Sequence, residues 1–347
     1  MTISAELVRT PRLETWTRRA GDPEHPPLVL VHGNVSSGVF FEPLMERLAD
    51  RFHLIAPDFR GYGGSERRAI DATRGLRDLS DDLAALIETL ELRTPLHVLG
   101  WSAGGGVVMQ YAIDHPDRVA GLILEAGMSP YGFGGTKGLD GTPSWPDHAG
   151  SGGGTVNPEF LRLLAEGERG SDSPASPLNT MRAFYTRPEF RLEPAFEERC
   201  LTGMLDTRTG DDIYPGDSTP SEHWPGVAPG MTGMNNALSP RYLDLSGFAD
   251  LSPAVPVVWI RGDSDQIVSD TSMFDFGYLG QLGAVPGWPG EAVFPPQPML
   301  SQLRAVLERG GSFREVVYEA CGHSPHLEQE DRFAADLREF VTGGEPS

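Results

Sequence analysis

One serine stands between glycines in the stretch LHVLGWSAGGGVVMQYA, which covers residues 96–112. Residues 96–100 form an apolar run typical of a buried strand, and the pattern after the serine is helical. A Gly-x-Ser-x-Gly motif between a strand and a helix predicts a sharp turn that exposes the serine hydroxyl at the carboxyl edge of a sheet. We therefore expect Ser102 to be a nucleophile, with a structural turn serine as the alternative.

A nucleophilic serine needs a base to take its proton and a carboxylate to orient that base. Both residue types follow later strands. The stretch VVWIRGDSDQIV places Asp263 and Asp265 in the turn after one strand, and VVYEACGHSPHLEQ places His323 after the last strand. The chain order serine, acid, histidine is the order expected for such a triad on an α/β sheet.

Short apolar runs that end in turn residues predict the buried parallel strands that must position these side chains. The runs are residues 27–33, 53–57, 96–100, 119–125, 256–261 and 314–319. Helical patterns lie between them, notably over residues 78–91 with Ser80 as a candidate N-cap, and a closing amphipathic helix is expected over 327–342. The alternation predicts an α/β fold with a doubly wound, mostly parallel sheet.

The alternation of strand and helix breaks at about residue 127, where glycine and proline become frequent. Helical segments follow at about 157–168, 177–187 and 194–205. We therefore expect a core formed by residues 1–127 and 251–347, with residues 128–250 inserted as a largely helical, loop-rich cap. The long aromatic segment 269–300 is expected to be either a lid over the site or an oligomer contact.

Five stretches resemble motifs of the α/β-hydrolase superfamily, specifically its capped bacterial members. They are VLVHGN, APDFRGYGGS, VLGWSAGG, IRGDSDQIV and GHSPHLEQ, and they occur in the family's order. The resemblance implies the α/β-hydrolase fold, with Ser102 as the nucleophile, His323 as the general base and Asp265 as the acid. It also implies that the backbone N–H groups of Asn34 and Ala103 form the oxyanion hole.

Other acids and histidines have competing interpretations. Asp263 is an alternative acid in the same turn, and Glu125 is another, because some members of the superfamily take their acid from the strand that follows the nucleophile helix. His32 and His115 match family turn positions and are expected to be structural. His326 is expected to lie in the first turn of the last helix.

Aromatic side chains could line an apolar pocket or form the core of the cap. The candidate substrate-binding residues are Trp101, Tyr131, Phe133, Tyr185 and Trp224, and Trp145 lies in the same inserted region. A loop that contains Asp206, Asp211, Asp212 and Asp217 lacks calcium-binding spacing. We expect this loop to be a solvated acidic segment.

Composition narrows the class of protein. The 347 residues include 49 acidic and 28 basic side chains, and the formal charge of −21 disfavours nucleic-acid binding. No apolar run approaches the roughly 20 residues of a membrane span, and the N-terminal residues lack a secretory pattern, which predicts a cytoplasmic protein. Cys200 and Cys321 fit no disulfide framework or metal spacing, and no nucleotide-binding fingerprint is present, so we expect reduced thiols, no metal and no cofactor.

These features predict a serine hydrolase that cleaves a carboxylic ester or lactone through an acyl-enzyme. The same triad in relatives also serves C–C bond hydrolysis of ring-cleavage products, amide hydrolysis and cofactor-free perhydrolysis. A small-molecule-binding receptor with slow turnover is a further alternative. The serine at position 102 disfavours the aspartate-nucleophile chemistry of haloalkane dehalogenases and epoxide hydrolases. The expected partner is a small carbonyl substrate, and the sequence does not indicate an oligomeric state.

Overall fold

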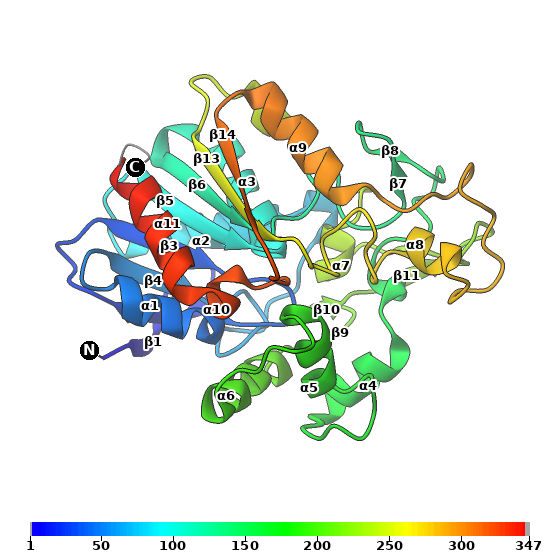
Figure 1. The fold of residues 1–347 in the computed structure, drawn as a ribbon, viewed down its shortest axis with the longest axis horizontal. Coiled ribbons are helices and arrows are strands. Elements are labelled where there is room, and N and C mark those ends of the chain that lie inside the picture. Colours follow the sequence, from blue (N-terminus) through cyan, green and yellow to red (C-terminus); the bar gives the residue numbers. More distant parts are fainter. Residues whose placement is uncertain (1, 344–347) are drawn as a thin grey trace.

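The computed structural model describes residues 2–343 and contains an eight-stranded sheet with helices on both faces (Figure 1). The strands are β1 (Ser4–Arg9), β2 (Glu14–Ala20), β3 (Pro27–Val31), β4 (His53–Pro57), β5 (Leu96–Trp101), β6 (Val119–Glu125), β13 (Val257–Gly262) and β14 (Phe313–Tyr318). Their order in the sheet is β1-β2-β4-β3-β5-β6-β13-β14. The β1–β2 and β2–β4 pairs are antiparallel and all other neighbours are parallel, which confirms the predicted fold class.

The helices that cover the sheet come from the connections between its strands and from the segment after the last strand, β14. They are α1 (Glu42–Leu48), α2 (Arg77–Thr89), α3 (Ala103–Asp114), α9 (Met299–Gly310), α10 (Pro325–Glu328) and α11 (Glu330–Thr342). Helices α1 and α11 pack together on one face, and α2 packs on α3 (Figure 1). The central strands are apolar and buried because helices cover both faces of the sheet, as expected for parallel strands.

Residues between β6 and β13 form small helices and short strand pairs beyond one end of the sheet (Figure 1). The helices are α4 (Pro158–Glu166), α5 (Pro177–Thr180), the π-helical turn Met181–Tyr185, α6 (Pro194–Leu205) and α7 (Met234–Ala237). The strands are β7 (Thr136–Lys137), β8 (Thr142–Pro143), β9 (Thr209–Gly210), β10 (Tyr214–Pro215), β11 (Ser218–Pro220) and β12 (Val227–Pro229). The later segment 269–300, which contains α8 (Phe276–Gln281), lies beside these elements.

Several boundaries differ from the sequence-based expectations. Helix α2 begins at Arg77, so Ser80 is a buried residue inside the helix and not its N-cap. The closing helix is divided into α10 and α11, and His326 lies in α10. Strands β1 and β2 were not predicted, because their largely exposed or half-exposed residues give no apolar run.

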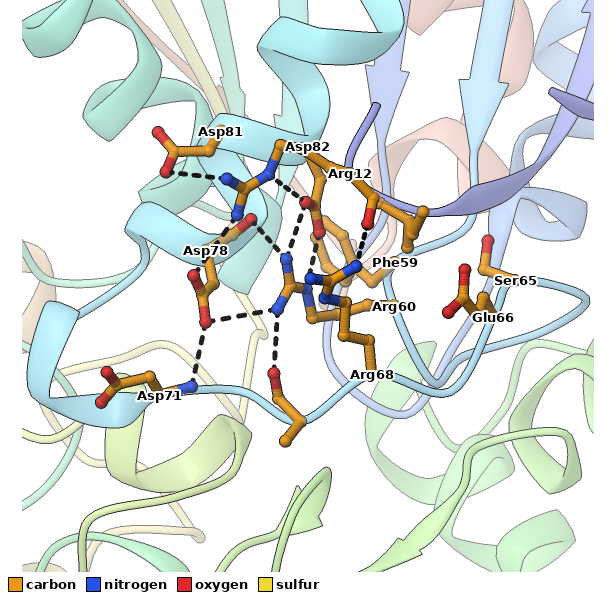
Figure 2. Close-up of polar contacts among 12 residues, drawn as sticks. Arg12, Phe59, Arg60, Ser65, Glu66, Arg68, Asp71, Asp78, Asp81 and Asp82 are labelled. Carbon is orange, nitrogen blue, oxygen red and sulfur yellow. Dashed lines mark hydrogen bonds and ion pairs between the residues drawn. The ribbon is translucent and has the colours of Figure 1, made fainter. Parts of the chain in front are cut away.

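A network of ion pairs fastens the loop after β4 to α2 (Figure 2). The Arg60 guanidinium donates through Nε and Nη2 to the two carboxylate oxygens of Asp82 at 2.6 and 2.7 Å. Arg12 donates to the same carboxylate at 2.6 Å, and Arg60 also pairs with Asp78. Because Arg60 is almost completely buried, this pairing satisfies a charge that would otherwise be costly to desolvate. The loop it fixes also carries Tyr62, which reaches the site described below.

Two further features concern the chain as a whole. Among residues 2–343, no helix combines the length and apolar character that crossing a lipid bilayer requires. Cys200 and Cys321 are both free and buried, and burial raises the pKa of each thiol.

Candidate active site

Ser102 occupies a strained turn between β5 and α3. Its φ and ψ are 57° and −120°, a conformation that non-glycine residues rarely adopt. A Cβ at Gly100 would lie 2.4 Å from the Gly104 carbonyl oxygen, and one at Gly104 would lie 2.3 Å from the Val31 carbonyl oxygen. Glycine is therefore required at both positions for the close approach of the backbone, and the turn holds Ser102 at the carboxyl end of β5.

His323 and Asp265 come from the turns after β14 and β13, and the structure brings them together. The Nδ1 atom of His323 lies 2.8 Å from Oδ2 of Asp265, and both side chains are almost fully buried. The other oxygen of Asp265 accepts from the backbone N–H groups of Ile267 at 2.8 Å and Val268 at 3.1 Å. Because the carboxylate is held from both sides, the imidazole is oriented with Nδ1 toward Asp265 and Nε2 away from it.

The two alternative acids lie elsewhere. Glu125 pairs with His326, whose Nδ1 and backbone N–H both contact Oε1, at 2.7 and 2.9 Å. This pair is completely buried and does not involve His323. Asp263 is exposed and accepts from Ser264 and from the Cys321 backbone N–H. Of the three carboxylates, Asp265 is thus the one bonded to His323.

The backbone N–H groups that the sequence predicts for the oxyanion hole are those of Asn34 and Ala103. Ala103 is the first residue of α3, so its N–H cannot bond within the helix. Within the described part of the chain, no acceptor is recorded for either N–H. Gly33 brings the loop close to Ser102, since a Cβ there would lie 3.0 Å from Cβ of Ser102.

Tyrosines from two parts of the chain hold the Asn34 loop. The hydroxyl of Tyr185, from the π-helical turn, donates to the carbonyl oxygens of Asn34 and Val35 at 3.1 and 3.0 Å. The hydroxyl of Tyr62 donates to Oδ1 of Asn34 at 2.7 Å. These bonds support Val35 in a backbone conformation with φ of 45°, which is unfavourable for a β-branched residue.

A cavity of about 510 Å³ opens over Ser102 and His323. Apolar side chains from residues 128–250 and from segment 269–300 form most of its wall, among them Phe160, Phe184, Leu238, Met273, Phe274 and Phe276. Segment 269–300 therefore lies over the site. Apart from His323, the described residues that line the cavity include no Asp, Glu, Lys, Arg or His.

The expectations for substrate-binding aromatic residues need partial correction. Trp101, Phe133 and Tyr185 line the cavity, whereas Tyr131 and Trp224 do not. Tyr131 packs under Gly141, and Trp224 packs against the rings of Phe276 and Phe294. Trp145, also outside the lining, stacks on His223 at 4.4 Å between ring centroids.

Two other histidines and one residue of the acidic loop have structural contacts. His32 receives the Phe59 N–H at Nε2, and burial lowers its pKa to about 3, so the ring is neutral at physiological pH. His115 ends α3 against the ring of Tyr111. Within the acidic loop, Asp212 pairs with Arg67. In the part of the chain that the structure describes, no group of three or more His, Cys, Asp or Glu residues could hold a metal ion.

The sequence did not predict the structural roles of Asp217 or of the buried Glu125–His326 pair. Asp217 also belongs to the acidic loop. Asp217 accepts from the N–H groups of Met231 and Thr232 at 2.8 Å each. The one sequence signal for a second acid–histidine pair beside the first is the presence of two histidines in GHSPHLEQ.

Comparison with known proteins agrees with this geometry. A family model described as alpha/beta hydrolase fold matches residues 26–276. A pimeloyl-[acyl-carrier protein] methyl ester esterase of Stenotrophomonas maltophilia is 28% identical over 330 residues, covering 93% of this chain and 95% of that protein. The magnesium-chelatase 30 kDa subunit of Rhodobacter capsulatus is 36% identical over 111 residues, which are 32% of this chain and 38% of that protein. The chain thus matches less than two-fifths of the length of that relative.

Solved structures share the fold along the whole chain. The crystal structure of a putative aryl esterase from Burkholderia cenocepacia superposes with a TM-score of 0.60 at 21% identity, covering 98% of this chain and 99% of that chain. With the family model spanning most of the sequence, the chain belongs to the α/β-hydrolase family.

Proposed function

We propose that this protein is a serine hydrolase that cleaves an uncharged carboxylic ester or lactone through an acyl-enzyme. The observation that carries the proposal is the arrangement around the turn at Ser102. Ser102 stands in a strained turn, His323 is bonded to Asp265, and Ser102 and His323 both line an apolar cavity. The relative of similar length from Stenotrophomonas is named as a methyl ester esterase, which supports ester cleavage.

In the proposed reaction, Oγ of Ser102 attacks the ester carbonyl carbon while Nε2 of His323 takes its proton. The Nδ1–H group donates to Asp265, which stabilises the imidazolium. The negative charge that develops on the carbonyl oxygen is received by the N–H groups of Asn34 and Ala103. The leaving alcohol takes the proton from His323, and the same base then activates water to release the acid and restore Ser102.

The lining of the cavity favours a neutral substrate. A carboxylate transferred into this cavity would find no arginine or lysine among the described lining residues. Burying an unpaired charge costs several kcal/mol even after relaxation. The dienoate products of aromatic ring cleavage carry such a carboxylate, so this lining supports ester or lactone cleavage over C–C hydrolysis.

The proposal also assigns roles to the parts of the chain. Residues 1–127 and 251–347 form the catalytic core and carry Ser102, Asp265 and His323. Residues 128–250 act as the cap that supplies most of the apolar wall, and segment 269–300 completes it.

The test is hydrolysis of p-nitrophenyl esters of increasing chain length and of lactones by the wild-type protein and by Ser102→Ala. The proposal predicts turnover of neutral esters that falls by about 10⁵-fold or more in the variant. A matched control is Ser264→Ala, an exposed serine outside the cavity lining, which should retain wild-type activity. Equal activity of wild type and Ser102→Ala would refute the assignment of the nucleophile.

A further inference from the structure

We infer that Asn235 binds the substrate: its side-chain amide donates a hydrogen bond to a neutral oxygen that the substrate carries close to the scissile carbonyl. The inference rests on the proposed function, because it assigns a specificity residue to the same cavity. Asn235 belongs to α7, far in sequence from the nucleophile, and no motif singles it out.

The orientation of two asparagine amides follows from one backbone N–H. The Val35 N–H donates to the side-chain oxygen of Asn34 at 3.0 Å, and this contact requires an acceptor at that atom. The Tyr62 hydroxyl donates to the same oxygen. The other end of the Asn34 amide must therefore be its NH2 group.

The NH2 group of Asn34 in turn fixes the amide of Asn235. It lies 2.9 Å from the side-chain oxygen of Asn235, which must be the acceptor in this contact. The NH2 group of Asn235 is consequently the end of the amide that does not contact Asn34. Within residues 2–343, no acceptor is recorded for it, and Asn235 lines the cavity together with Ser102 and Asn34.

The neighbouring residue makes this position rigid. Asn236 is completely buried, and its NH2 group donates to Oδ1 and the carbonyl oxygen of Asp217 and to the Thr232 carbonyl oxygen, at 2.6 to 2.9 Å. Its side-chain oxygen accepts from the N–H groups of Gly153 and Gly230. Hydrogen bonds at both ends of the Asn236 amide thus hold α7 in place, so Asn235 meets the substrate as a preorganised donor.

The chemistry of the acceptor follows from the surroundings. The cavity lining is mostly apolar and lacks acidic and basic side chains apart from His323, so the group that meets the amide should be neutral. Asn235 touches Asn34, whose backbone N–H is the proposed oxyanion donor, so the acceptor lies near the reacting carbonyl. We expect an ether, keto, hydroxyl or second ester oxygen at that position of the substrate.

The experiment compares two esters of nearly the same shape, p-nitrophenyl butyrate and p-nitrophenyl methoxyacetate, in which one CH2 group is replaced by an ether oxygen. The measured quantity is the ratio of kcat/KM for the methoxyacetate to that for the butyrate. Intrinsic reactivity differs between the two esters, but this difference cancels when the ratio is compared between proteins. In Asn235→Leu the ratio should fall by about 3- to 10-fold, the worth of one neutral hydrogen bond.

A second variant separates recognition from folding. Asn235→Asp keeps an oxygen that accepts from Asn34 and replaces the donor by a second acceptor, so its ratio should fall at least as far. If Asn235 had only a structural role, its variants would lower kcat/KM equally for both esters, and the ratio would not change. Asn179→Leu, which removes a cap amide outside the cavity lining, is the control and should keep the wild-type ratio.

The outcomes are distinguishable. Lower ratios in both Asn235 variants, with Asn179→Leu unchanged, support the inference. If both esters are hydrolysed in a Ser102-dependent way and every variant keeps the wild-type ratio, the role of Asn235 is overturned and the proposed function is retained. Failure of the wild-type protein to hydrolyse either ester would overturn the proposed function and the inference together.

Discussion

Replacing Asp265 by asparagine should invert the proton positions on His323 without moving its ring. Oδ1 of Asp265 accepts from the N–H groups of Ile267 and Val268, so the asparagine oxygen should keep that place. Its NH2 group would then face Nδ1 of His323, 2.8 Å away in the native protein. Nδ1 would have to accept, and the proton would move to Nε2, the atom that must take the proton of Ser102.

The expected cost is a fall in kcat of about 10⁴-fold, or about 5.5 kcal/mol of transition-state stabilisation. The assay is steady-state hydrolysis of p-nitrophenyl butyrate, with thermal unfolding to show that the variant is folded. Glu125→Gln and Asp263→Asn are the matched controls, because neither carboxylate contacts His323, and each should change kcat by less than about tenfold. Retention of a tenth of the activity in Asp265→Asn, or an equal loss in Glu125→Gln, would refute the assignment of the acid.

Three further perturbations test the surroundings of the site. Burial raises the pKa of Asp275 to about 6 from an ordinary value of 3.8, so its ionisation opposes folding, and the contribution of Asp275 to the free energy of unfolding should fall as pH rises from 4 to 7. Asp275→Asn should lack this contribution, so its free energy of unfolding, measured by urea titration, should rise by about 2 kcal/mol relative to that of the wild type between pH 4 and pH 7. A difference between the two proteins that does not change with pH would contradict the assignment. Arg60→Met leaves a buried carboxylate short of a partner and should cost about 3 kcal/mol of stability, against less than 1 kcal/mol for Arg67→Met at an exposed pair; similar costs would count against the network in Figure 2. Phe274→Ala removes an edge-to-face contact with Phe184, 5.0 Å between ring centroids, and should raise KM for p-nitrophenyl butyrate about threefold; an unchanged KM would show that segment 269–300 does not contact this substrate.

The sheet was predictable because its central strands are buried on both faces. Such strands must be continuously apolar, and β4 and β6 stand out in the sequence for that reason. The turns that follow the strands carry Ser102, Asp265 and His323. The positions of the strand ends therefore predicted that these three side chains lie near one another. Strand β1, at the edge of the sheet, and its neighbour β2 gave no such signal, since side chains that face water need not be apolar.

The support around Asn34 could not be predicted, because it depends on contacts between residues far apart in the sequence. Asn235 is 201 residues from Asn34, and Tyr185 is 151 residues away. Neither periodicity nor residue spacing reveals such pairs, because their geometry depends on how residues 128–250 fold back on the rest of the chain. Two of the five aromatic candidates lie outside the cavity lining for the same reason: Tyr131 and Trp224 are aromatic, as pocket residues often are, but pack against other parts of the chain.

The most direct test of the central claim is labelling of the protein with a fluorophosphonate, followed by peptide mapping. The probe reacts with an activated serine and stays attached as a stable phosphonyl ester. The account predicts one label per chain, on Ser102, appearing in step with the loss of ester hydrolysis and absent from Asp265→Asn on the same time scale. A label on a different residue, or full activity after Ser102 has been modified, would contradict it.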